Sequence, residues 1–315
     1  MVLVSTGRLL GGEDLHWPAS STVVARAREL GGIGGVAHGG AFGARHTAML
    51  DTVLGKMDFF EIFNPGRFKT DLWYRMLNAG YLLPPAAGTD LPNSPRRAWW
   101  QPFLGSVRCY VQVGESRNFE SWKKSFREGR VFVTSGPVIR LNVDGRQPGG
   151  TVRLAKGGRV EIEAELISLP RPQRLMVLFN GKVVESSEEI SRWGPARSIR
   201  LRRSLRIEES GWLAAQGVAA PAEPIDEFMA RQPMVLDAEG VEAGLLAHTG
   251  VVRVLVGEQP IGRSDELEAI IRDLDDLRTY YGVQASYSSP QERLQTLELF
   301  EQAMSRIRRR LEGEQ

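Results

Sequence analysis

The N-terminal third of the chain alternates between two hydrophobic periods. Apolar residues spaced three or four apart predict helices, and each helix is followed by a short apolar run typical of a buried strand. The predicted helices cover residues 20–30, 45–57 and 69–81, and the predicted strands cover residues 33–38, 58–64 and 84–90. This order predicts an α/β fold with parallel strands, in which chemistry lies at the carboxyl ends of the strands.

The period changes after a transition at residues 91–135. Residues 137–256 contain short strands of alternating polarity separated by turn residues. Two of these turns, Asp144-Gly145 and Asn180-Gly181, are residue pairs that favour tight hairpins. Because no long helical pattern interrupts this span, it predicts an antiparallel β-sandwich.

The C-terminal residues carry two amphipathic helical patterns. The first begins at Ser264, and the second begins with a serine cap at Ser289 followed by a proline. We expect the two helices to form a hairpin that packs on the sandwich, and they also offer a surface for a homodimer. The sequence is thus divided into a β/α part at residues 1–135, a β-sandwich at residues 136–258 and a helical hairpin at residues 259–315.

Composition argues against several classes of partner and chemistry. The 40 basic residues nearly balance the 38 acidic ones, so we expect no nucleic-acid partner. Cys109 is the only cysteine, so no intramolecular disulfide can form. The sequence shows no apolar run long enough to cross a membrane and no signal-peptide pattern, which predicts a soluble protein. It also lacks a nucleophile elbow, a Walker A loop and an HExxH motif.

Polar side chains follow each of the predicted parallel strands. His38, Glu61 and Asp90 fall at or near the three carboxyl ends. Imidazole and carboxylate ligands suit zinc, manganese or iron, and a bound ion lowers the pKa of its water and so generates a hydroxide nucleophile. Each residue also has a structural interpretation: a strand-end hydrogen bond for His38, a helix cap for Glu61 and a turn for Asp90. His46 opens the next helix and is expected on the surface or as a cap.

Blocks of sequence along nearly the whole chain resemble, in order, the CehA/McbA-like metallohydrolases of the PHP (polymerase and histidinol phosphatase) superfamily. The resemblance implies a distorted β/α barrel whose strand ends hold divalent metal ions, and hydrolysis of an ester-like bond in a small molecule. By position, His38 and Asp90 would be metal ligands, and Glu61, Thr89 and Asn64 would support them. The blocks are residues 31–40, 51–64, 73–90, 105–113, 126–145, 209–218 and 247–257.

The sequence also departs from the pattern of this family. The HxH motif of the first barrel strand is absent, Gly39 replaces a proline, and Pro92 stands where many members have a second histidine. The chain therefore resembles the C-terminal part of a catalytic barrel, from a truncated or a degenerate protein, and a leader sequence could be lost with the missing part. We expect weak metal binding and little hydrolase activity. The alternative is a non-catalytic module in which the sandwich binds a carbohydrate or protein partner and the half-barrel is a remnant.

Overall fold

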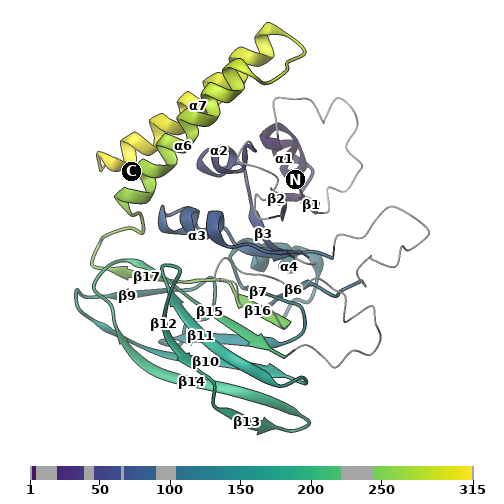
Figure 1. Cartoon of the computed structure of the whole chain (residues 1–315), viewed down its shortest axis with the longest axis vertical. Coiled ribbons are helices and arrows are strands. Elements are labelled where there is room, and N and C mark those ends of the chain that lie inside the picture. The colour runs from purple at the N-terminus through teal and green to yellow at the C-terminus, as the bar shows by residue number, and fades with distance from the viewer. Residues whose placement is uncertain are drawn as a thin grey trace.

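The computed structural model describes residues 2–4, 20–38, 46–64, 67–89, 104–220 and 245–313. Within these ranges the fold is mixed α/β, with three sheets and six helices. Figure 1 shows the small α/β sheet in the middle, two larger sheets stacked below it and the pair of C-terminal helices above it. No closed barrel is present among these residues, because the α/β strands form an open sheet.

The α/β sheet has three parallel strands at its centre, as the sequence predicts. β2 pairs with β3 and β3 with β5, both in parallel, while β1 and β4 add antiparallel edges. Gly31 and Gly80 lie two residues after the last residues of α1 and α3, and their positive φ angles of 77° and 83° suit a residue without a side chain. The elements are β1 (Val2–Val4), α1 (Ser20–Glu29), β2 (Ile33–Val36), α2 (Ala48–Val53), β3 (Phe59–Asn64), β4 (Arg67–Phe68), α3 (Asp71–Asn78) and β5 (Pro85–Ala87).

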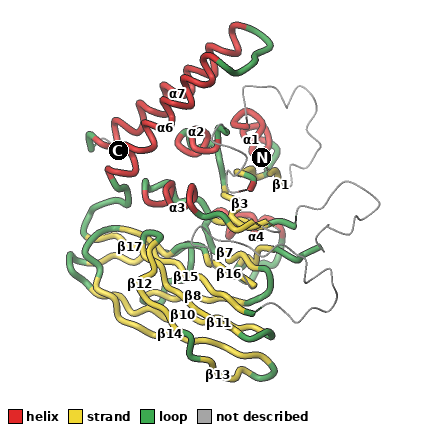
Figure 2. The backbone as a smooth tube through the Cα atoms, viewed as in Figure 1, coloured by secondary structure: helices red, strands yellow, loops and turns green. Residues whose placement is uncertain are grey.

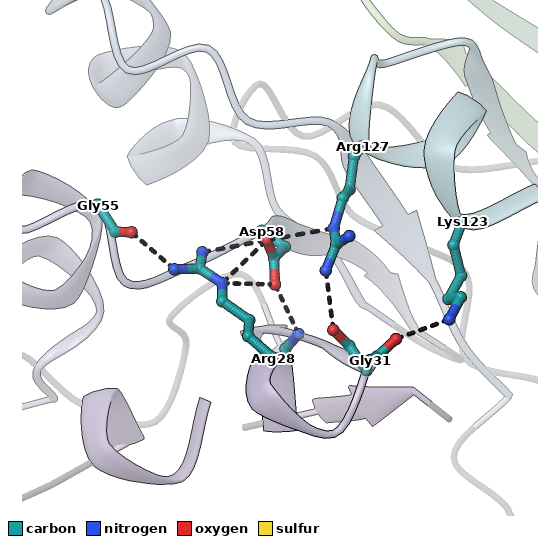
Figure 3. A network of polar contacts seen from close by, with 8 residues as sticks. Arg28, Gly31, Gly55, Asp58, Lys123 and Arg127 are labelled. Atoms are coloured by element: carbon teal, nitrogen blue, oxygen red, sulfur yellow. Dashed lines mark hydrogen bonds and ion pairs between the residues drawn. The ribbon is translucent and has the colours of Figure 1, made fainter. Parts of the chain in front are cut away.

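An ion-pair network supports this sheet at the amino end of β3. Arg28 donates to both carboxylate oxygens of Asp58, at 3.0 and 3.2 Å. On the other side of this carboxylate, Arg127 Nε lies 3.6 Å from Asp58 Oδ1 (Figure 3). Arg127 and Lys123 come from α4 (Phe119–Arg127) and also donate to the carbonyl oxygens of Gly32 and Gly31. The network therefore joins α4 to the α1–β2 turn.

Two larger sheets are built mainly from antiparallel strands and stack with a shared apolar core (Figure 2). One has four strands in the order β13-β14-β10-β8, and the other has eight, of which six follow the order β12-β11-β15-β16-β7-β6. The strands are β6 (Arg108–Val111), β7 (Val131–Thr134), β8 (Val138–Val143), β9 (Thr151–Leu154), β10 (Arg159–Ser168), β11 (Pro172–Phe179), β12 (Lys182–Ser187), β13 (Ile190–Trp193), β14 (Ala196–Arg206), β15 (Gly211–Ala219), β16 (Leu245–Thr249) and β17 (Val252–Val256).

Two features of these sheets can be compared directly with the sequence predictions. Asn180 and Gly181 both have positive φ, 51° and 83°, and join β11 to β12 in the predicted hairpin. Strands β6 and β7 lie within residues 1–135, which the sequence assigns to the β/α part, but they hydrogen-bond into the eight-stranded sheet. The residues of the transition segment therefore link the α/β sheet to the larger one.

The two C-terminal helices, α6 (Ser264–Val283) and α7 (Pro290–Leu311), form the predicted antiparallel pair. Ser289 caps α7 by accepting the Glu292 N–H at 3.1 Å, as the sequence predicts. The sequence predicted packing on the sandwich, whereas the pair lies mainly against α2 and α3, whose apolar faces join its core (Figure 1). Arg75 of α3 pairs with Asp273 at 2.7 Å. No helix in the described part of the chain has the length and hydrophobicity needed to cross a bilayer.

A cluster of aromatic rings joins α3 to the eight-stranded sheet. Trp73 and Tyr74 pack against Trp212 and His248, with ring centroids 5.0 to 6.4 Å apart. Trp212 Nε1 donates to Asn78 Oδ1 at 2.8 Å, and Tyr74 Oη lies 2.7 Å from His248 Nε2. We call these five residues the aromatic junction. The buried polar side-chain atoms of the aromatic junction all have hydrogen-bond partners, as expected for a well-packed core.

Helix α2 contains a buried carboxyl group that makes the fold sensitive to pH. Asp51 accepts a hydrogen bond from Thr47 Oγ1 at 2.7 Å, but its Oδ1 has no partner among the described residues. Burial raises the pKa of Asp51 from 3.8 to about 6, against the opposing effect of Thr47. Between these values the folded protein keeps a proton that the unfolded chain has lost, so stability falls as the pH rises through this range.

We therefore expect Asp51→Asn to stabilise the protein at pH 7 by about 1–2 kcal/mol, since it removes the charge while the amide oxygen still accepts from Thr47. The gain should vanish near pH 4. Urea unfolding followed by circular dichroism at both pH values measures it. Asp58→Asn is the matched control and should destabilise at pH 7, because Arg28 and Arg127 pair with that carboxylate. A loss of stability at pH 7 in the Asp51 variant would contradict the assignment.

Candidate functional site

The carboxyl ends of β2, β3 and β5 meet at one edge of the α/β sheet, because the three strands are parallel neighbours. His38 follows β2 after one intervening residue, Glu61 and Asn64 belong to β3, and Thr89 follows β5. The structure therefore brings His38 and Glu61 together, as their strand-end positions predict, with Asn64 beside His38. Asp90, the second predicted metal ligand, lies outside the described residues.

His38 has an unusual backbone conformation that Glu61 supports. Its φ of 56° places it in the left-handed region, which costs a non-glycine residue roughly 1 kcal/mol. Its N–H donates to Glu61 Oε2 at 2.9 Å, and Glu61 is almost fully buried. Since strained residues held by buried polar groups concentrate at functional sites, this pair identifies the turn after β2 as a candidate site.

The imidazole of His38 lies between two polar side chains of β3. Its Nδ1 is 3.2 Å from Asn64 Nδ2 and 4.0 Å from Glu61 Oε2. With the amide nitrogen facing the ring, Asn64 donates to Nδ1. If Nε2 bound a metal, Nδ1 would carry the proton and would need an oxygen acceptor. Rotation of the Asn64 amide, or a shift toward Glu61, would provide that acceptor, so both residues can orient a metal-bound histidine.

The end of β5 approaches the Glu61 carboxylate closely. A Cβ atom at position 88 would lie 2.6 Å from Glu61 Oε1, so Gly88 makes this approach possible. Cys109 of β6 accepts the Ala87 N–H at 2.9 Å beside the same carboxylate. Burial, with an added contribution from the Glu61 charge, raises the pKa of Cys109 to about 12. The thiol therefore stays protonated at neutral pH and is a poor nucleophile.

Thr89 has a structural partner in the described structure. Its Oγ1 donates to the Val107 carbonyl oxygen at 3.1 Å and accepts the Gly105 N–H at 3.0 Å. These bonds fix the segment before β6 against the end of β5. Thr89 therefore influences the site through the position of the chain that follows β5.

The described residues alone do not complete a metal centre. Within them, no group of three His, Cys, Asp or Glu side chains is close enough to hold an ion. His38 and Glu61 supply one imidazole and one carboxylate, whereas a catalytic zinc site usually has three protein ligands.

The other two described histidines have structural partners. His46 Nδ1 accepts the Ala48 N–H at 3.2 Å at the start of α2, consistent with the predicted capping role. His248 is fully buried, and its Nδ1 lies 2.7 Å from the Thr249 carbonyl oxygen. Since a carbonyl only accepts, Nδ1 carries the proton, and Tyr74 donates to Nε2.

Comparison with protein-family models and with curated proteins finds no match. The functional interpretation therefore depends on the residues at the sheet edge and on the resemblance of the sequence blocks.

Proposed function

We propose that the edge formed by β2, β3 and β5 is part of the metal centre of a PHP-type hydrolase that acts on an ester, carbamate or phosphoester. The observation that supports this most strongly is the left-handed His38 whose N–H binds the buried Glu61 carboxylate at the carboxyl end of a parallel strand. In this proposal the α/β sheet is a portion of the barrel, and the two stacked sheets are the appended β-sandwich.

The residues have separate roles in this proposal. His38 and Asp90 are the ligands for zinc, manganese or iron. Glu61 and Asn64 contact His38 and orient it, and Thr89 anchors the end of β5 next to Asp90.

We expect this 315-residue chain to bind zinc weakly and to hydrolyse p-nitrophenyl acetate at close to the uncatalysed rate. His38→Ala should weaken zinc binding by at least about tenfold, since it removes the imidazole ligand. Competition with a chromophoric chelator measures the affinity, and metal analysis after dialysis measures the stoichiometry.

His46→Ala is the matched control, because it also removes an imidazole close in sequence, but one whose Nδ1 accepts the Ala48 N–H. Its zinc affinity should equal that of the unchanged chain. Equal zinc affinity in the two variants would overturn the assignment of His38. If the unchanged chain bound zinc tightly in a stoichiometric amount and also hydrolysed the ester, the proposal that its metal site is incomplete would be wrong.

A further inference from the structure

On one side of the stack, the eight-stranded sheet extends beyond the edge of the four-stranded sheet. The four-stranded sheet ends at β8, which packs over β15 and β16 of the other sheet. Beyond β16, the eight-stranded sheet continues with β7 and then β6. A cavity of about 780 Å³ lies at this step, and residues of β6, β7 and β8 line it together with parts of β10 and β14. Its volume is in the range of specific binding sites.

Strand β8 presents main-chain groups to this cavity. The Asp144 N–H donates to the Glu161 carbonyl oxygen, and since paired residues alternate in an antiparallel ladder, Arg140 and Asn142 also point toward β10. The N–H and C=O of Ile139 and Leu141 therefore point to the free edge. No hydrogen-bond partner for them exists in the described ranges, and Val138 to Asn142 all line the cavity.

The floor of the cavity is an aromatic surface. Tyr110 and Phe132 are directly opposite each other on β6 and β7, and their rings stack with centroids 5.0 Å apart. Tyr110 remains 46% exposed, although its ring lies on the side of the sheet that faces the shared core. A strand added to β8 would cover these rings with its inward side chains.

The cavity lining carries an excess of positive charge. It contains four arginines but only two glutamates, and Glu165 is shared by Arg140 and Arg200 at 3.4 and 2.7 Å. Exposed ion pairs of this kind contribute little to stability, so the arginines can exchange partners at small cost. The charge favours an acidic occupant. It disfavours a second copy of this chain, because edge-to-edge pairing of β8 would bring two arginine-rich surfaces together.

We infer that the edge of β8 binds an extended acidic peptide segment of a partner protein, which adds a fifth strand to the four-stranded sheet above Tyr110 and Phe132. The Ile139 and Leu141 main chain supplies hydrogen bonds, as in other cases of strand addition, and the arginines select for acidic side chains. This inference is independent of the proposed hydrolase function, since no residue of the sheet edge near His38 takes part.

The test uses a fluorescein-labelled heptapeptide of alternating glutamate and valine, with fluorescence anisotropy on the full chain at physiological salt. A second peptide has the same sequence with N-methylated valines, and a third has lysine in place of glutamate. We expect both to bind at least about tenfold more weakly, because they lose main-chain hydrogen bonds and charge attraction respectively. On binding of the first peptide, hydrogen exchange at Ile139 and Leu141 should slow at least about tenfold.

Neighbouring residues on β14 provide the matched variants. Arg202 lines the cavity and pairs with Glu163 at 3.0 Å, whereas Arg203 lies outside it and pairs with Glu185 at 3.5 Å. Arg202→Glu should weaken binding at least about fivefold, and Arg203→Glu should change it less than about twofold, with both variants checked for folding by circular dichroism. Equal binding of the N-methylated peptide, or equal effects of the two variants, would overturn the inference. Protection of the same amides by self-association alone would also overturn it and identify a second copy as the occupant.

Discussion

Replacing Trp212 with alanine is expected to lower the free energy of unfolding by about 3–5 kcal/mol, the range found for large buried aromatic residues. The side chain is fully buried in β15, and its ring centroid lies 5.0 Å from that of Tyr74. Its removal would leave a cavity between α3 and the eight-stranded sheet. Urea unfolding monitored by circular dichroism measures the loss.

The hydrogen bond of Trp212 can be separated from its packing. Trp212→Phe keeps most of the apolar contact but leaves Asn78 Oδ1, which now accepts from Nε1 at 2.8 Å, without that donor. We expect this variant to lose about 1–3 kcal/mol, the cost of an unsatisfied buried polar atom. It should therefore fall between the unchanged chain and Trp212→Ala.

Trp122 is the matched control for ring removal. It is only half-buried on α4, where it stacks on Phe119 and Phe126 with centroids 5.6 and 5.1 Å apart. Trp122→Ala should cost less than about half as much as Trp212→Ala, because less apolar area leaves water at this position. Equal losses in the two alanine variants would contradict the structural importance of the aromatic junction.

Local patterns predicted the elements of this fold well. The apolar runs at residues 33–38 and 58–64 became β2 and β3, and the Ser289 cap begins α7. The Asn180-Gly181 pair also forms its predicted hairpin. These features depend on residues close in sequence, so the sequence itself contains the physical cause.

Contacts between distant segments were not predictable in the same way. The alternating apolar residues of β6 and β7 predict strands, but the same pattern fits either neighbouring sheet. The apolar stripes of α6 and α7 likewise predict buried faces without naming the surface that covers them. They lie against α2 and α3 because those helices present apolar faces on the outside of the small sheet. Which surface each of these elements packs against depends on contacts between distant segments, and the spacing of apolar residues within one element does not contain that information.

The candidate site shows the same division. Strand-end placement predicted that His38 and Glu61 would lie close together, and they do. Asn64, which the family resemblance implied as a supporting residue, lies beside His38. The left-handed backbone of His38 was not predictable, since that conformation usually selects glycine and is stabilised here by a carboxylate from another strand. The buried environment of His248 was also missed, because Trp73 and Tyr74 reach it from a distant part of the sequence.

Acid is expected to destabilise the protein through His248. Burial lowers the pKa of His248 from its ordinary value of 6.5 to about 4, against the opposing effect of the Thr249 carbonyl. Between these values the unfolded chain binds a proton that the folded protein does not. Stability contributed by the neutral imidazole is therefore complete above pH 6.5 and is lost as the pH falls toward 4, by about 3 kcal/mol in all.

The test compares His248→Gln with the unchanged chain in urea unfolding between pH 4 and pH 7.5. The variant should be less stable at neutral pH, because it disturbs the contacts to Tyr74 and Thr249. Its deficit should shrink by about 3 kcal/mol as the pH falls to 4, since only the unchanged chain loses the histidine contribution. Asp51 changes stability in the opposite direction over nearly the same range, but it is present in both proteins, so the difference between them isolates His248. A pH-independent deficit in His248→Gln would show that the pKa of this imidazole is the same in the folded and unfolded states.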